Sequence, residues 1–276
     1  MHCHSTASDG QLRPAELVAH AAQAGIEVIA LTDHDSIDGQ VELQQAAQAA
    51  GLRSISGVEL SVRWEKRTLH VVGLGMDPHH ASLTQALQRL QQARQRRSEE
   101  IARKCHALGL ESALEEAAAL ADGGQITRTH FARLLLSKGK VKDLKQAFKR
   151  YLGAGKPLYV AGEWLGLEEA IGAIHDSGGV AVLAHPLRYG FTGAWRERMY
   201  TAFVGAGGVG VEVSAGASQG PDELALVAAE AQRHGLLGSV GSDFHGLEQR
   251  WLRYGRLRPL PPGVQPLWEA RPQLLR

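Results

Sequence analysis

Residues 26–35, IEVIALTDHD, join a short apolar run to four polar residues at its end. The apolar part, residues 26–31, has the length and the branched side chains of a buried strand, and the polar residues 32–35 follow it directly. The segments on either side, residues 12–24 and 38–50, have the apolar spacing of amphipathic helices. The stretch therefore predicts one unit of an α/β fold, with polar side chains at the carboxyl end of its strand.

The same alternation returns along the rest of the chain. Strand-like segments lie at residues 53–62, 67–75, 180–186, 209–216 and 236–245, and helical ones at 166–177, 194–206 and 221–234. Strands that alternate with helices of about 10–15 residues imply βα units and a mostly parallel sheet. The proline-rich tail, residues 258–276, is expected to lie across this α/β body.

The middle of the chain has a different pattern. Residues 83–109 read as one long amphipathic helix, and shorter helical patterns follow at 111–123, 129–139 and 141–153 without a convincing strand. We therefore expect a helical insertion in an α/β body. The predicted division is residues 1–82 and 157–276 for the α/β body and residues 83–156 for the helical insertion domain.

Composition limits the class of protein. The chain has 276 residues, of which 44% are apolar and 21% charged, as in an ordinary globular protein. It has no run of 18 apolar residues and no secretory pattern, and Cys3 and Cys105 are too few for a disulfide framework or a cysteine zinc site. We expect a cytoplasmic enzyme with no membrane association and no obligate protein partner.

Potential metal ligands occur at or near the predicted strands. One lone histidine there is more often structural, and the HxH of MHCHSTASDG, residues 1–10, could be the remnant of a tag. Several such positions together favour a site, because the carboxyl ends of parallel strands meet at one face and buried ionisable groups are costly unless paired or coordinated. The candidates are His2, His4, Asp9, His34, Glu59, His70, His185, Asp243 and His245.

The chemistry of these candidates indicates divalent metals. Imidazole and carboxylate without thiolate suit Zn, Mn or Fe, and a carboxylate such as Glu59 could bridge two ions. Clusters of two or more metals mainly serve phosphoester and amide hydrolysis. Six other histidines fall on predicted helices or in polar loops and are expected to be structural: His20, His79, His80, His106, His175 and His234.

The motifs HCHS, LTDHD, GVE, HVVGLG, AHP and GSDFH together resemble the PHP (polymerase and histidinol phosphatase) family, from His2 to about His245. With ITRTHFARLL and FKRYLGAGKP in the insertion, the chain is similar to the branch of bacterial 3′,5′-nucleoside bisphosphate phosphatases and related 5′-to-3′ exoribonucleases. The resemblance implies a distorted (β/α)7 barrel with up to three divalent metals, Mn or else Zn or Fe.

The resemblance also assigns ligands to the ions. It gives His2, His4, Glu59 and Asp243 to the first metal, Glu59, His70 and His185 to the second, and Asp9, His34 and His245 to the third. One departure concerns the start of the chain, because Met1 stands where family members carry a first strand. That strand would be missing, and His2 is expected to lie on a fraying end.

The insertion is basic. Residues 126–156 contain nine Lys or Arg and one acid, Asp143. Such runs are more often solvated faces, but the resemblance places the RTHFAR motif over the metals, and an arginine fork suits a phosphate. His130 could instead be a metal ligand, although its helical position favours substrate. The expected substrate contacts are Arg128, Thr129, His130, Phe131, Arg133, Lys149 and Arg188.

The activity that the resemblance implies is hydrolysis of the 3′-phosphate of nucleoside 3′,5′-bisphosphates, such as pAp, by a metal-activated hydroxide. Asp243, His245 and His34 are the expected catalytic residues, and Arg128 with His130 would hold the second phosphate. One alternative is a 5′-to-3′ exoribonuclease on short RNA. A histidinol-phosphate phosphatase is disfavoured by the basic insertion, and a non-catalytic nucleic-acid-binding module is disfavoured by the full ligand set.

Overall fold

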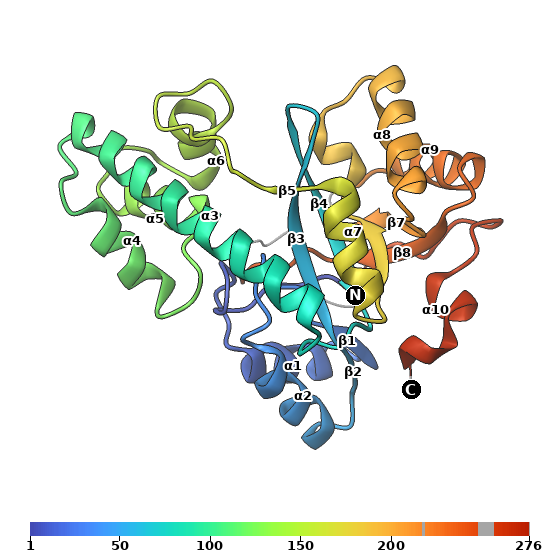
Figure 1. The fold of residues 1–276 in the computed structure, drawn as a ribbon. Coiled ribbons are helices and arrows are strands. Elements are labelled where there is room, and N and C mark those ends of the chain that lie inside the picture. Colours follow the sequence, from blue (N-terminus) through green and yellow to red (C-terminus); the bar gives the residue numbers. More distant parts are fainter. Residues whose placement is uncertain (217–218, 248–256, 276) are drawn as a thin grey trace.

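The computed structural model describes residues 1–216, 219–247 and 257–275 and shows a mixed α/β fold, as expected (Figure 1). A parallel pair joins β1 (Val28–Ala30) to β2 (Arg53–Ile55). A second sheet has the strand order β5-β3-β4-β6-β7-β8. Its strands are β3 (Gly57–Trp64), β4 (Arg67–Leu74), β5 (Leu165–Gly166), β6 (Val180–Leu183), β7 (Gly210–Ala215) and β8 (Leu237–Gly241).

Strand β4 departs from the parallel pattern. It runs antiparallel to both β3 and β6, whereas β3 with β5, β6 with β7 and β7 with β8 are parallel. Only Glu65 and Lys66 separate β3 from β4, and so short a link permits a hairpin but no crossover. As a result, Glu59 and His70 lie within their strands, and the expectation that they close strands was wrong. Ser61 pairs with His70, which puts Glu59 and His70 on one face of the hairpin.

Five helices cover the α/β body: α1 (Pro14–Gln23), α2 (Gln40–Ala49), α7 (Leu167–Asp176), α8 (Gly193–Gly205) and α9 (Pro221–Arg233). The main core lies between the six-stranded sheet and α7, α8 and α9, with residues such as Leu69, Ile171 and Phe203 fully buried. The tail forms α10 (Leu267–Ala270) and a 3-10 turn, and it buries Leu267 and Leu274 against the strands, as expected. No helix among the described residues is long and apolar enough to cross a membrane.

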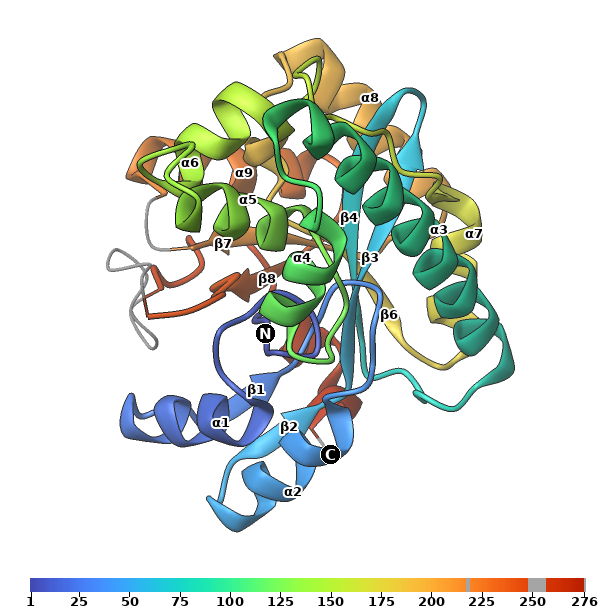
Figure 2. The ribbon, with the colours of Figure 1, turned by 90° about the vertical axis from the view of Figure 1, so that its left-hand side faces the viewer.

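The helical insertion stands at one side of the sheet, and its helices α4 and α5 lie in front of the strands in Figure 2. It contains α3 (Ala81–Cys105), α4 (Ala113–Ala121), α5 (Arg128–Ser137), α6 (Leu144–Ala147) and a π-helical turn at Phe148–Leu152. Helix α3 serves two cores. Its first half buries Leu83 and Leu90 in the body, and its second half buries Ile101 and Cys105 in a separate core of the insertion.

The first residues of the chain are held on both sides by backbone hydrogen bonds. The Asp243 N–H donates to the His2 carbonyl and the His4 N–H to the Phe244 carbonyl, each at 2.9 Å, while the Thr32 N–H donates to the Cys3 carbonyl at 2.9 Å. His2 is therefore only 1% exposed, and the expectation of a fraying end was wrong. This arrangement brings residues 2–4, the end of β1 and the end of β8 together.

Candidate metal centre

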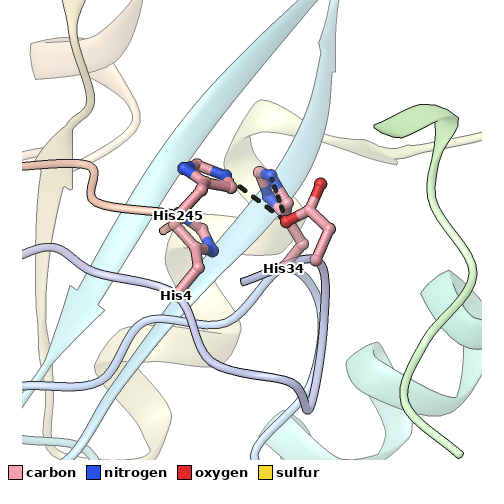
Figure 3. Close-up of side chains that lie close together, drawn as sticks. His4, His34 and His245 are labelled. Atoms are coloured by element: carbon pink, nitrogen blue, oxygen red, sulfur yellow. Dashed lines mark ion pairs between the residues drawn. The ribbon is translucent and has the colours of Figure 1, made fainter. Parts of the chain in front are cut away.

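All nine predicted metal ligands converge at one mouth of the α/β body, and Figure 3 shows three of them, His4, His34 and His245, facing a common point. Three groups have ligand atoms within 4.8 Å of one another: His2, His4, Glu59 and Asp243; His4, Asp9, His34 and His245; and His34, Glu59 and His70. His185 joins them, because its Nε2 lies 3.0 Å from Glu59 Oε1. The first group has the same four members as the set that the family resemblance implied.

Glu59 lies at the centre of the cluster and is fully buried. Its Oε1 lies 2.9 Å from His70 Nδ1 and 3.0 Å from His185 Nε2, and its Oε2 lies 2.7 Å from His34 Nδ1. Burial alone would raise the pKa of Glu59, but the imidazoles of His70, His34 and His2 outweigh it and hold the pKa well below its usual value. Its carboxylate is therefore ionised and shared among several imidazoles, as a bridging ligand would be.

The geometry of these groups fits divalent metal ions. Among the described residues, Glu59 Oε2 and His34 Nδ1 approach to 2.7 Å, yet both atoms are buried and have no partner with hydrogen-bond geometry, and Asp9 Oδ1 is in the same state. Ligands that point at a common ion approach one another in this way, and an unsatisfied buried polar atom otherwise costs about 1–3 kcal/mol. Burial and the neighbouring His245 and His34 lower the pKa of His4 to about 3, which keeps its imidazole neutral, as metal binding requires.

Glu212 in β7 supports the ligands and was missed in the sequence. It accepts hydrogen bonds from His2 Nδ1 at 2.7 Å and from the His185 backbone N–H at 2.8 Å. The first bond leaves Nε2 of His2 to face the cluster, which is how carboxylates orient metal-binding histidines. An acidic residue inside the apolar segment VGVEVSAG was the available signal, because it is 1% exposed and needs a buried partner.

Glu212→Gln is expected to weaken metal binding by about 10- to 100-fold, since an amide accepts a weaker hydrogen bond and orients His2 less firmly. Metal content after dialysis against graded chelator would measure the change, with the exposed Glu269→Gln as the control. Unchanged metal retention in Glu212→Gln would contradict the orienting role.

Two aspartates next to His34 shape the loops instead of facing the cluster. Asp33 accepts hydrogen bonds from Ser5 N–H, Ser5 Oγ and Ser8 Oγ at 2.6–2.7 Å, which folds the loop that carries Asp9. Asp35 accepts from the Ser61 N–H at 2.6 Å. Asp35, His185 and Asp243 all have positive φ, between 31° and 50°, and such strain in non-glycine residues often marks functional sites.

A small arginine-lined cavity of about 70 Å³ lies between the ligands and the insertion. Asp9, His34 and His70 line one side, and Arg94 and Arg97 of α3 and Arg128 of α5 line the other. We call this space the arginine cavity. Arg94 pairs with Asp35 at 2.6 Å. The other two arginines form no ion pair among the described residues: Arg97 donates to the Val160 carbonyl, and Arg128 packs over the Phe148 ring.

The positive charge in the arginine cavity favours an anion. Burial lowers the pKa of Arg97 to about 9, and repulsion by the positive charges of Arg128 and Arg94 contributes to this shift. A phosphate would relieve this repulsion and could accept forked hydrogen bonds. Arg94 and Arg97 were missed in the sequence. They stand three residues apart on the buried face of α3, and charge on an otherwise apolar helix face was the signal.

A larger groove of about 780 Å³ lies on the other side of the ligands. The body contributes Arg188, Asp243 and His245, and the insertion contributes apolar and basic side chains. The residues from the insertion are Thr129, Arg133, Leu136, Lys142, Asp143, Leu144, Lys145 and Phe148. Thr129 and Phe148 line both spaces, so the groove adjoins the arginine cavity.

The predicted substrate contacts divide into three groups. Arg128 lines the arginine cavity and Thr129 lines both spaces, while Arg133 and Arg188 line the groove. Three others lie elsewhere in the described structure: His130 is 1% exposed, with Nδ1 accepting from the Thr127 N–H; Phe131 is fully buried; and Lys149 is exposed away from both spaces. The motif RTHFAR therefore has a buried middle, residues 130–132, between residues that line the cavity and the groove.

Phe131→Ala is expected to lower the free energy of unfolding by about 3–5 kcal/mol, because it removes a fully buried ring from the core of the insertion. Urea denaturation would measure this loss. A rise in KM with unchanged stability would show instead that Phe131 contacts substrate, as the sequence motif had suggested.

Imidazoles and carboxylates that converge at one mouth of the α/β body, beside arginines that line a cavity, define a hydrolase site of the phosphoester type. The chain belongs to the PHP domain family, whose model matches residues 1–160. It is 45% identical over 269 residues to a 5′-3′ exoribonuclease of Haemophilus influenzae. The aligned region covers 98% of this chain and 97% of that protein.

Two further matches come from Chromobacterium violaceum. A 3′,5′-nucleoside bisphosphate phosphatase is 40% identical over 278 residues, which is 100% of this chain and 97% of that protein. The solved structure of an amidohydrolase with bound sulfate and no metal superposes with a TM-score of 0.93 at 39% identity, covering 99% of this chain and 95% of that one. The family that the sequence motifs indicated is thereby confirmed.

Proposed function

We propose that this chain hydrolyses the 3′-phosphate of nucleoside 3′,5′-bisphosphates, and that it acts in the cytoplasm. The observation that carries the proposal is the arginine cavity beside the metal-ligand cluster. A bisphosphate has two dianionic groups, and the site offers two different places for them. The similarity to a phosphatase of this specificity supports the same substrate class. The location rests on the cysteine content, because the two cysteines, Cys3 and Cys105, are too few for the disulfide framework that small secreted domains use.

The nine clustered side chains would hold up to three divalent ions, with Mn as the first choice and Zn or Fe as alternatives. We assign His2, His4, Glu59 and Asp243 to one ion, Glu59, His70 and His185 to the second, and Asp9, His34 and His245 to the third. When bound, such ions polarise phosphoryl oxygens and lower the pKa of a water from ~16 toward ~7.

The remaining steps fall to the side chains around the ions. Arg97 and Arg128 would hold the phosphate that does not react. They would thereby fix the distance between the reacting phosphate and the metal ligands. Arg188, which pairs with Asp243 at the edge of the groove, is placed to stabilise charge on the reacting phosphoryl oxygens. Asp243 or His245, on the same wall, would hold the proton that leaves the attacking water.

A phosphate-release panel tests the proposal. The Mn-loaded protein would be offered pAp, 3′-AMP, 5′-AMP, histidinol phosphate and short RNAs, and initial rates would be compared. We expect pAp to be hydrolysed fastest, with 5′-AMP as its product. Equal rates on all five substrates would contradict a site built for two phosphates.

A second candidate, 5′-to-3′ exoribonuclease activity, is favoured by the size and charge of the groove. Arg133, Lys142 and Lys145 line it, and about 780 Å³ exceeds what one phosphate needs. The Haemophilus influenzae relative carries this activity in its name. If RNA occupies the groove, 5′-phosphorylated oligonucleotides should compete with pAp, and their binding should weaken steeply with salt. Salt-independent binding would argue against this second activity.

A further inference from the structure

We propose that Thr127, in the helical insertion, is a positioning residue that orients Asp9 as a metal ligand. The inference rests on the metal centre proposed above and makes the binding of one of its ions depend on the insertion. The third ion would be bound fully only when the insertion is docked on the loop of residues 5–10. The insertion would then contribute to the metal centre itself as well as to the substrate site.

The key contact is a hydrogen bond between two buried side chains. Thr127 Oγ1 donates to Asp9 Oδ2 at 2.9 Å, and the two residues are 7% and 2% exposed. The other oxygen, Asp9 Oδ1, lies 3.3 Å from His245 Nε2 and 3.9 Å from His34 Nε2. The threonine hydroxyl thus occupies one carboxylate oxygen and leaves the other to face the two histidines of the proposed third ion.

The direction of this hydrogen bond is fixed by helix α5. Thr127 is the N-cap of α5, and its Oγ1 accepts from the Thr129 N–H at 3.0 Å. A hydroxyl has one proton, and with an acceptor lone pair engaged by the helix that proton is directed to Asp9. The Thr127 N–H in turn donates to His130 Nδ1 at 3.0 Å, which holds the backbone of the cap in place.

Two further hydrogen bonds hold the same surfaces together. The Gln125 N–H donates to the Ala7 carbonyl at 3.0 Å, and Arg133 donates to the Asp9 carbonyl at 2.9 Å. The insertion therefore hydrogen-bonds the backbone of the loop of residues 5–10 at two points, and Thr127 hydrogen-bonds the side chain of Asp9. Carboxylate ligands that are oriented by such neighbours typically bind metal about 10- to 100-fold more tightly than those that are not.

Metal binding in three variants of Thr127 tests the proposal without relying on activity. Thr127→Val keeps the branched shape but removes the hydroxyl, Thr127→Ser keeps the hydroxyl, and Thr127→Gly removes it while remaining a tolerated N-cap. We expect Thr127→Val and Thr127→Gly to retain about one Mn per chain fewer than wild type after dialysis, or to bind it about 10- to 100-fold more weakly. Thr127→Ser should retain the wild-type metal content.

The control is Ser137→Ala at the other end of α5, which removes a hydrogen bond to the Leu134 carbonyl far from Asp9. It should keep wild-type metal content whatever its stability. Wild-type metal binding in both Thr127→Val and Thr127→Gly would overturn the proposal and leave Thr127 as a helix cap only. A wild-type protein that binds metal normally but releases phosphate from no substrate would overturn the proposed function and not this inference.

Discussion

Glu59→Gln is expected to lower kcat/KM for phosphate release by about a thousandfold or more, which corresponds to roughly 4 kcal/mol of lost transition-state stabilisation. Within the part of the chain that the structure describes, Glu59 is the one carboxylate that contacts the imidazoles of His34, His70 and His185 together. A neutral amide would leave these imidazoles without their shared anion and could not bridge two cations. Metal content should fall along with activity.

The comparison variant for Glu59→Gln is Glu169→Gln on the surface of α7, where the lost pair with Arg89 is exposed and worth little. Steady-state kinetics with pAp and metal analysis on the same samples would measure both effects. Glu59→Gln protein that keeps its full metal content and a rate within tenfold of wild type would refute the bridging role.

Arg128→Met is expected to lower kcat/KM for a nucleoside 3′,5′-bisphosphate by about 10- to 100-fold, the value of one charge-assisted hydrogen bond to phosphate. The loss should be mainly in KM. Hydrolysis of 3′-AMP, which lacks the second phosphate, should change far less, because Arg128 lies across the arginine cavity from His34 and His70.

The decisive measurement for Arg128 is the ratio of kcat/KM for pAp to kcat/KM for 3′-AMP. Arg103→Met is the matched control, because Arg103 is exposed on α3 and its one ion pair among the described residues is with Glu100 of its own helix. An equal loss on pAp and 3′-AMP would mean that Arg128 acts on the reacting phosphate, and the arginine cavity would then not be the subsite for the second one.

The sequence predicted the helices and strands well because the apolar periodicity is strong on both sides of the insertion. Its main error was β4, whose direction is set by the two-residue link after Trp64 and not by periodicity. That error did not harm the ligand prediction. Glu59 and His70 reach the cluster from the middle of a hairpin, because Ser61 lies opposite His70 and Glu59, two residues before Ser61, points to the same face.

The candidate site was predicted unevenly. The candidate ligands carry their chemistry in motifs such as HxH and GSDFH, so all nine could be named as candidates before the fold was known. Supporting residues have no such motif: Glu212, Arg97 and Thr127 act through contacts with partners far away in the chain. For Phe131 the error is the reverse: the sequence motif predicted a substrate contact, whereas its side chain is buried in the core of the insertion.

The pairing of the first residues with the end of β8 determines when the metal centre can exist. His4 and Asp243 meet across 239 residues of chain, and Cys3 bridges to Phe244. Closing so long a loop is entropically costly and is rewarded only after the intervening elements have packed. On the ribosome, His2 and His4 emerge well before Asp243, and they have no carboxylate from the segment after β8 until 239 further residues have followed His4. The complete site is thus among the last features to form, and its metal affinity reports the finished fold.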